Sequence, residues 1–76
     1  MDEQEQHEMT PGQIVRRARM ERGLRQTELA RYAGSAPTYI CRIEKDGCPI
    51  GASLAARLAK VLNLDINLLL KDKYDH

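Results

Sequence analysis

The sequence predicts an all-α fold, a single compact domain built from five short helices. Three observations lead to this prediction. Apolar residues recur at three- and four-residue spacing, glycine and proline divide the chain at short intervals, and no segment shows the alternation of a strand or an internal repeat. The chain has 76 residues, and a domain this small buries only about 60% of its unfolded surface. An elaborate enzyme is therefore not expected.

Clear signals mark both ends of the first predicted helix. Thr10, Pro11 and Gln13 form a capping-box pattern with proline at the first helical position, and Gly23 marks the end. The helix is therefore predicted over residues 11 to about 22. Its buried stripe consists of Ile14, Val15 and Ala18, with Arg19 or Met20 at the margin. We expect the polar, acidic residues 1–9 that precede the domain to form a disordered arm.

The second and third helices are predicted as a pair joined by a tight turn. They cover residues 26–33 and 37–45, and Gly34 supplies the positive φ that a turn of three to four residues needs. Pro37 suits a first helical turn, because an N–H at that position would have no partner. The inward stripes consist of Leu29, Ala30, Ala33, Ile40 and Ile43. Two half-buried stripes of this kind must pack against each other.

The rest of the domain, which spans residues 10–70, is predicted as a turn and two further helices. Residues 46–49 form the turn, and the fourth helix covers residues 50 to about 62. Its inward side chains are Ala55, Leu58, Ala59 and Leu62. Asp65 caps a short fifth helix that ends at Leu70, and residues 71–76 form a polar tail.

The net charge of +1 conceals an uneven distribution. Between Arg16 and Lys45 there are eight basic and three acidic residues, which gives +5, whereas the first nine residues carry four carboxylates, which gives −4. The basic segment coincides with the predicted helix pair. An arginine-rich first helix can be an ordinary solvated face, but this coincidence favours a surface that attracts a polyanion.

Membrane, secreted, metal and catalytic classes find no support in the sequence. No apolar run approaches the roughly 20 residues of a membrane span, and the acidic start lacks the features of a secretion signal, so we expect a cytoplasmic protein without a membrane partner. In that compartment Cys41 and Cys48 are expected to be free thiols. His7 and His76 lie in the tails, far from either cysteine, so neither a catalytic pair nor a zinc site is expected. No cofactor or small-molecule ligand is expected either.

At residues 26–44 the sequence QTELARYAGSAPTYICRIE resembles the Cro and phage-repressor helix-turn-helix family, often called Xre-like. The residues that match the family pattern are Gln26, Leu29-Ala30, Gly34, Ile40 and Glu44. The resemblance extends from about Gly12 to Leu70 and implies a lambda-repressor-like fold. The chain departs from the family at Arg25 and Ala36, where a Ser, Thr or Asn cap is usual, and at Ser35, where Val is usual. Because a cap contributes about 1 kcal/mol, we expect a locally softer motif.

The resemblance also implies binding to double-stranded DNA, with the third helix in the major groove. The expected base contacts are Ala36, Pro37, Thr38, Cys41 and Arg42. Arg42 is the strongest candidate, because a guanidinium can donate two hydrogen bonds to guanine O6 and N7. The expected phosphate contacts are Arg25, Gln26, Tyr39 and Lys45. The family also has an arginine paired with the closing glutamate, which implies a pair between Arg19 and Glu44; direct contact of Arg19 with phosphate is the alternative.

Three classes of function remain open at this point. The favoured class is a sequence-specific transcriptional regulator. The others are a protein-interaction module, such as an antitoxin or a repressor partner, and an architectural DNA binder with little sequence preference. Within the first class the segment TYICRIE and the short last helix resemble the controller proteins of restriction-modification systems, with small phage Cro-like or repressor proteins as close alternatives.

A homodimer is expected on grounds of interface size. One helix-turn-helix domain buries roughly 600 to 1,000 Å² on DNA, which is too little for tight specific binding, so two copies on a two-fold operator are expected. The expected dimer contacts are Ile66, Leu68, Leu69 and Leu70. The alternative is that these side chains only close the core of one copy.

Overall fold

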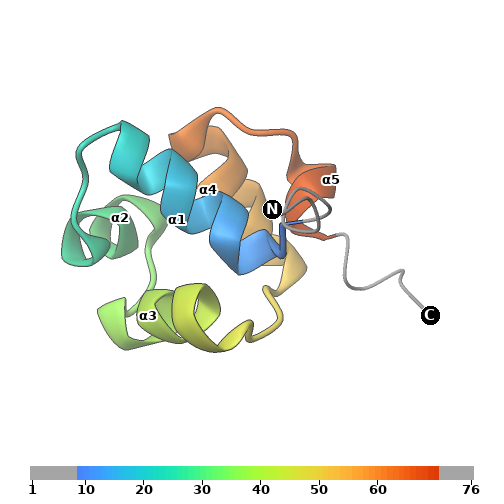
Figure 1. Ribbon diagram of the computed structural model, residues 1–76. Coiled ribbons are helices and arrows are strands. Elements are labelled where there is room, and N and C mark those ends of the chain that lie inside the picture. Colours follow the sequence, from blue (N-terminus) through green and yellow to red (C-terminus); the bar gives the residue numbers. More distant parts are fainter. Residues whose placement is uncertain (1–8, 71–76) are drawn as a thin grey trace, which may run out of the picture.

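The computed structural model describes residues 9–70 and shows five α-helices in that range (Figure 1). They are α1 (Pro11–Glu21), α2 (Gln26–Ala33), α3 (Pro37–Asp46), α4 (Ala52–Leu62) and α5 (Ile66–Leu69). No strand occurs among these residues, and the predicted all-α class is confirmed. The expected acidic arm, apart from Met9, and the polar tail over residues 71–76 lie outside the described residues.

The helices form a compact bundle in which α1 is packed on by helices from both halves of the chain. It packs against α3, α4 and α5, while α2 packs between α3 and α4. In Figure 1, α3 lies at the lower edge of the domain, α4 lies behind α1, and α5 lies at the right, near the start of α1. This arrangement leaves one long side of α3 free of other helices.

Local signals set most helix ends where they were predicted. At the start of α1, Thr10 Oγ1 accepts a hydrogen bond from the Gln13 N–H (3.2 Å) and Gln13 Oε1 accepts one from the Thr10 N–H (3.0 Å). Gly34 adopts the left-handed conformation (φ 67°) at the end of α2. At the start of α5, Asp65 accepts from the Asn67 N–H at 2.9 Å.

The two motif helices begin without a side-chain cap from the residues at the cap positions, Arg25 and Ala36. Glu28 partly replaces the missing cap of α2, since its carboxylate accepts from the Arg25 N–H at 2.8 Å. At the start of α3, Pro37 removes one N–H that would lack a partner. Tertiary contacts must therefore hold α3 in place.

The prediction for the start of α4 is wrong by two residues. The helix begins at Ala52, because Gly51 is extended at the N-cap (φ −64°, ψ 152°), and the Ile50 side chain packs into the core from the preceding loop, where it is 2% exposed. Helix α3 extends one residue beyond the prediction, to Asp46.

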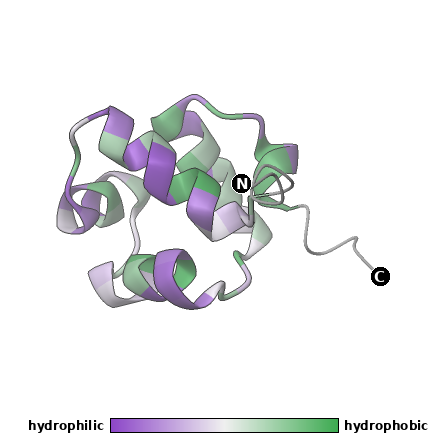
Figure 2. Cartoon of the chain, in the orientation of Figure 1, coloured by the Kyte–Doolittle hydropathy of each residue, from purple (hydrophilic) through white to green (hydrophobic). Residues whose placement is uncertain are grey.

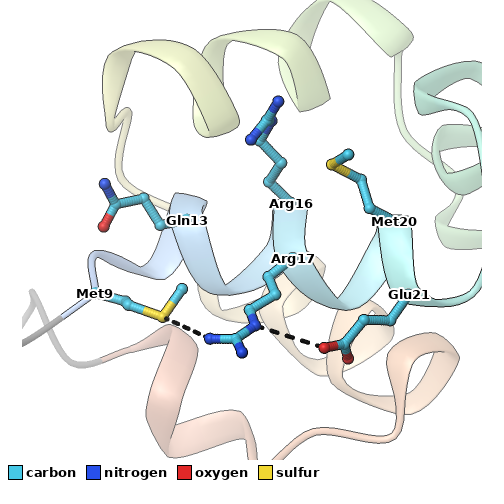
Figure 3. Close-up of a pocket in the computed structure, with 6 residues that line it drawn as sticks. All are labelled: Met9, Gln13, Arg16, Arg17, Met20 and Glu21. Carbon is cyan, nitrogen blue, oxygen red and sulfur yellow. Dashed lines mark hydrogen bonds and ion pairs between the residues drawn. The ribbon is translucent and has the colours of Figure 1, made fainter. Parts of the chain in front are cut away.

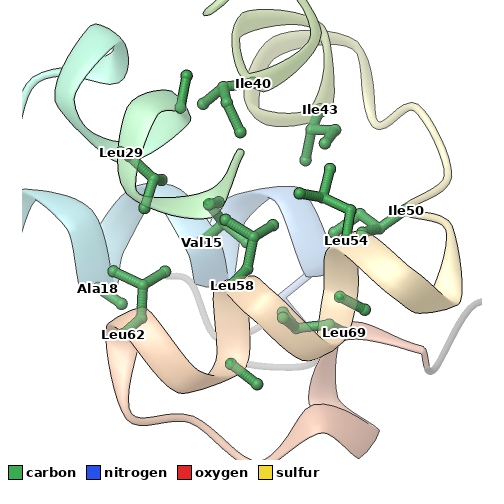
Figure 4. Close-up of a cluster of buried hydrophobic side chains, with 14 residues drawn as sticks. Val15, Ala18, Leu29, Ile40, Ile43, Ile50, Leu54, Leu58, Leu62 and Leu69 are labelled. Atoms are coloured by element: carbon green, nitrogen blue, oxygen red, sulfur yellow. The ribbon is translucent and has the colours of Figure 1, made fainter. Parts of the chain in front are cut away.

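One continuous cluster of side chains from all five helices and the loop before α4 forms the core (Figure 4). Figure 2 shows the apolar stripes turned toward this interior and polar residues on the outer faces. The fully buried members of largest volume are Val15, Leu29, Ile40, Ile43, Leu58, Leu62 and Leu69. Leu54, which the predicted stripe of the fourth helix omitted, also belongs to the core. No helix in the described part of the chain has the length and apolarity needed to cross a membrane.

Leu69 requires a correction, because it was expected at a dimer interface. Its side chain is only 1% exposed and lies in the core, so a single copy offers almost no Leu69 surface to a partner. Leu68 on the same helix is 41% exposed, and Ile66 and Leu70 are partly buried against the core.

Two arginines from other parts of the chain donate to carbonyl oxygens at the ends of helices. Arg22 Nη2 donates to the Leu62 carbonyl oxygen at the end of α4 (2.7 Å). Arg57 Nη1 donates to the Ala33 carbonyl oxygen at the end of α2 (3.1 Å). Unpaired carbonyls at a helix end carry partial negative charge, so a guanidinium is a favourable partner there.

The backbones of α1 and α3 are in direct contact at Gly12. A Cβ atom at this position would overlap the carbonyl oxygen of Ile43 and would lie 2.9 Å from its carbonyl carbon and 3.3 Å from Glu44 Cα. Glycine is therefore required in this helix because the two backbones touch, although glycine inside a helix is otherwise unfavourable. The contact places the C-terminal half of α3 directly on the first turn of α1.

A buried ion pair fixes the same two helices at a second point. Arg19 Nε and Nη2 donate to the two carboxylate oxygens of Glu44 at 2.8 and 3.0 Å, and Arg19 Nη1 donates to the Leu24 carbonyl oxygen at 2.7 Å. The side chains are 12% and 2% exposed respectively. The pair occupies the position that the family resemblance implied, and it ties α3 to α1 and to the loop before α2.

The first prediction concerns Gly12. Gly12→Ala should destabilise the domain by about 2 to 3 kcal/mol, because the new methyl group must push two backbones apart. In a helix position without such a contact, the same change would stabilise the domain by about 0.5 to 1 kcal/mol. Urea unfolding followed by circular dichroism measures the difference. Gly51→Ala is the control, since a Cβ there meets nothing within 4 Å. A Gly12→Ala protein more stable than the parent by about 0.5 to 1 kcal/mol would show that the helices are not in contact at this point.

The second prediction concerns the ion pair. Arg19→Met should destabilise by about 3 to 5 kcal/mol, since it leaves a buried carboxylate without its cation. The double variant Arg19→Met/Glu44→Leu should be more stable than the single one, because no unpaired charge remains. Denaturant unfolding of both variants tests this order, and a double variant less stable than Arg19→Met would contradict it.

Candidate nucleic-acid interface

The outer side of α3 presents polar and charged side chains on a rigid support. Ile40 and Ile43 are fully buried and fix the rotation of the helix, while Thr38, Arg42 and Lys45 are exposed. The remaining expected base-contact residues are Ala36 and Pro37, which are exposed at the start of α3, and Cys41, which is partly exposed. The structure therefore brings the five expected base-contact residues onto one accessible side of the domain.

Arg42 is the long hydrogen-bond donor near the middle of this side. Within residues 9–70 its guanidinium makes no hydrogen bond or ion pair. Its neighbour two positions on, Glu44, turns toward α1 and pairs with Arg19 rather than with Arg42. A planar guanidinium in this position can donate two parallel hydrogen bonds to an acceptor pair outside the protein.

Gln26 is tied to α3 by a contact that the sequence did not indicate. Its Nε2 donates to Glu44 Oε1 at 3.0 Å, so the amide is oriented by the same carboxylate that binds Arg19. The second hydrogen on Nε2 and the Oε1 acceptor are left for other partners. The first residue of α2 and the C-terminal half of α3 are thereby held in one hydrogen-bonded group.

Tyr39 has a structural contact where a phosphate contact was expected. Its hydroxyl donates to the Pro49 carbonyl oxygen at 3.0 Å, and its ring packs partly against the core. A phenol has one hydrogen to donate, so in this conformation Tyr39 cannot donate to a phosphate. It instead fastens the loop that follows α3.

The charge around α3 is positive once the internal pairs are taken into account. Arg19 neutralises Glu44. The exposed cations near the motif are Arg16 on α1, Arg25 before α2, Arg31 on α2, and Arg42 and Lys45 on α3. Asp46 is exposed at the end of α3 and opposes them. The expected phosphate-contact residues Arg25 and Lys45 thus lie on the surface, as such a role requires.

The other candidates on the described surface are thiol, metal and small-molecule sites. Cys41 and Cys48 are free thiols. Within the described residues no group of three or more His, Cys, Asp or Glu side chains could hold a metal ion. An open hollow on the exposed face of α1 is lined by six side chains, which are Met9, Gln13, Arg16, Arg17, Met20 and Glu21 (Figure 3). The exposed pair between Arg17 and Glu21, with 3.5 Å between Nε and Oε2, lies along it.

Comparison with known proteins identifies the family. The helix-turn-helix family model HTH_3 matches residues 15–69 of the chain. A curated relative, the ImmF control region 10 kDa protein of Bacillus phage phi105, is 34% identical over 58 residues, which make up 76% of this chain and 64% of that protein. The chain thus spans somewhat less than two thirds of the length of this relative.

Solved structures with the same fold are also similar in sequence. The crystal structure of SinR, the master regulator for biofilm formation, in complex with DNA superimposes with a TM-score of 0.72 at 30% identity, covering 79% of this chain and 97% of that chain. The N-terminal DNA-binding domain of SinR from Bacillus subtilis gives a TM-score of 0.75 at 28% identity, covering 87% and 97%. The lambda-repressor-like fold expected from the resemblance is thereby confirmed, and the chain belongs to the helix-turn-helix family.

Proposed function

We propose that the chain is a sequence-specific transcriptional regulator that binds a two-fold operator as a homodimer, with α3 in the major groove. The observation that carries the proposal is the outer side of α3, where Thr38 and Arg42 are exposed above the fully buried Ile40 and Ile43. A helix about 10 to 12 Å across with its side chains fits a groove about 12 Å wide. A regulator of this kind acts where the chromosome lies, which in bacteria is the cytoplasm.

In this proposal the base contacts come from one end and the middle of α3. Arg42 donates to guanine O6 and N7, and Thr38 bonds a base edge or packs on a thymine methyl group. The apolar contacts are supplied by Ala36 and Pro37. Cys41 is partly exposed between these positions and is close enough to contribute a weak polar or apolar contact.

The phosphate contacts in the proposal come from residues around the motif. Gln26 uses its second Nε2 hydrogen, aided by the N–H groups at the start of α2. Arg25 and Lys45 contribute charge from exposed positions. We omit Tyr39, because its hydroxyl hydrogen is bonded to the Pro49 carbonyl oxygen.

The named relatives support this function. A solved complex shows SinR bound to DNA, and the relative from phage phi105 is named for a control region. The phage relative favours a phage-repressor type of regulator among the alternatives that the sequence left open. A further solved structure shows SinR together with SinI, so a domain of this fold also occurs in a protein that assembles with another protein.

The third prediction separates base recognition from anchoring. Arg42→Ala should cost about 1 to 3 kcal/mol on DNA selected from a random pool and should relax the preference at one guanine position in each half-site. Gln26→Ala should weaken binding to selected and random duplexes alike, since a phosphate carries no sequence information. Binding titrations of both variants at fixed salt, with repeated selection for Arg42→Ala, measure these effects.

Thermal melting provides the control for Arg42→Ala, because an exposed substitution should change stability by no more than about 0.5 kcal/mol. If that variant melts normally and keeps the affinity and base preference of the parent, Arg42 does not contact bases. If the parent selects no sequence from the pool, the proposal of a sequence-specific regulator is wrong.

The fourth prediction concerns the dimer. The proposed contact is the outer edge of α5, where Leu68 is exposed and Ile66 and Leu70 are partly buried. The parent should therefore sediment as a dimer at roughly tens of micromolar, both free and on its operator. Leu68→Glu should shift it to the monomer, because the substitution places a charge in this contact. Tyr32→Ser removes a large side chain from α2 that is more exposed than Leu68 (58% against 41%) and should leave the dimer intact. A parent that is monomeric in both states would exclude this interface.

A further inference from the structure

Residues 1–8 carry four carboxylates, at Asp2, Glu3, Glu5 and Glu8, that the proposed function does not use. The described chain begins with Met9, directly before α1. Arg17 Nη1 approaches the Met9 sulfur at 3.9 Å, which holds Met9 against the exposed face of α1, at one end of the hollow in Figure 3. The acidic segment therefore joins the domain on the surface of α1.

The C-terminal half of α3 lies beside this junction. Gly12, three residues after Met9, packs on the backbone of Ile43 and Glu44, so Arg42 and Lys45 flank the point of contact. Arg16 follows Gly12 by one helical turn on the same face of α1, and in Figure 3 its side chain extends toward α3. We call these three exposed cations, Arg16, Arg42 and Lys45, the α1–α3 basic surface.

These cations differ from several arginines of the domain that donate hydrogen bonds within the fold. Arg19, Arg22 and Arg57 donate to a carboxylate or to carbonyl oxygens within the fold. Among residues 9–70, the three cations of the basic surface make no hydrogen bond or ion pair. Eight extended residues reach up to about 27 Å, whereas the ten residues of α3 span only about 15 Å. Chain length thus allows the segment to cover the whole outer side of α3.

We propose that residues 1–8 bind the α1–α3 basic surface of their own chain by charge attraction and compete there with DNA. The inference rests on the proposed function, because the competing ligand is the phosphate backbone. A segment tethered this close acts at an effective concentration of the order of millimolar, so individually weak carboxylate–cation contacts suffice. Salt should weaken the competition, because the Debye length falls from about 10 Å at 0.1 M to about 3 Å at 1 M.

The binding of the segment is tested first without DNA. In Glu5→Gln/Glu8→Gln, the NMR signals of residue 16 and of residues 41–45 should move, and added salt of about 0.5 M should move the same parent signals in the same direction. Asp72→Asn/Asp75→Asn removes equal charge from the other end of the chain and should leave those signals in place. Unchanged signals in Glu5→Gln/Glu8→Gln, equal movement in the control, or movement that depends on protein concentration would each overturn the proposal.

Competition with DNA is tested with all four carboxylates replaced, in Asp2→Asn/Glu3→Gln/Glu5→Gln/Glu8→Gln. This variant should bind both a selected duplex and a random duplex about tenfold more tightly than the parent at about 50 mM salt, and less than twofold more tightly near 0.5 M. Equal affinities at low salt would overturn the competition while leaving the proposed function intact. Absence of DNA binding by both proteins would overturn the proposed function, and the NMR comparison would still decide whether the segment binds the surface.

Discussion

The contact between α1 and α3 is the constraint on which the rest of the interface depends. At one point Gly12 brings the two backbones together, and at a second point Arg19 and Glu44 form a buried ion pair. The two contacts lie seven residues apart on α1 but meet α3 at the adjacent residues Ile43 and Glu44. They therefore hold this part of α3 against α1, while the buried Ile40 and Ile43 side chains fix the rotation of the helix. The side chains on the outer side of α3 then have defined positions relative to the rest of the domain, as recognition of base edges requires.

The ion pair matters more for geometry than for net stability. Removing two charges from water is costly, and a buried pair often contributes little beyond what apolar residues of similar size would give. Here the Glu44 carboxylate accepts from two of the three guanidinium nitrogens of Arg19, on α1, and from Gln26 Nε2, on α2. Apolar side chains could fill the same volume, but they would not select one orientation of α3 so narrowly. Because α3 begins without a side-chain cap, these tertiary contacts matter all the more for holding the helix in place.

Sequence reasoning succeeded where a signal is local and was incomplete where contacts are distant. The capping box of Thr10 and Gln13, the left-handed Gly34 and the Asp65 cap depend on residues within a few positions, and they set helix ends correctly. Leu69 was expected at a dimer contact, with closure of the core as the alternative, and Ile50 was expected inside the fourth helix. The packed core places Leu69 in the interior and Ile50 in the loop before α4. The Tyr39 hydroxyl and Gln26 amide likewise have partners 10 and 18 positions away that no short pattern encodes.

The internal pairing of charges explains how a chain of net charge +1 can present a positive surface. Glu44 stands on the helix that would face phosphates, and an unpaired carboxylate there would repel them. Because Arg19 neutralises it inside the domain, the charge that remains outward on α3 comes from Arg42 and Lys45, with Asp46 in opposition at the end. The same residues that hold α3 in position thus remove the negative charge that would hinder its approach to DNA, so its orientation and its electrostatics have one structural origin.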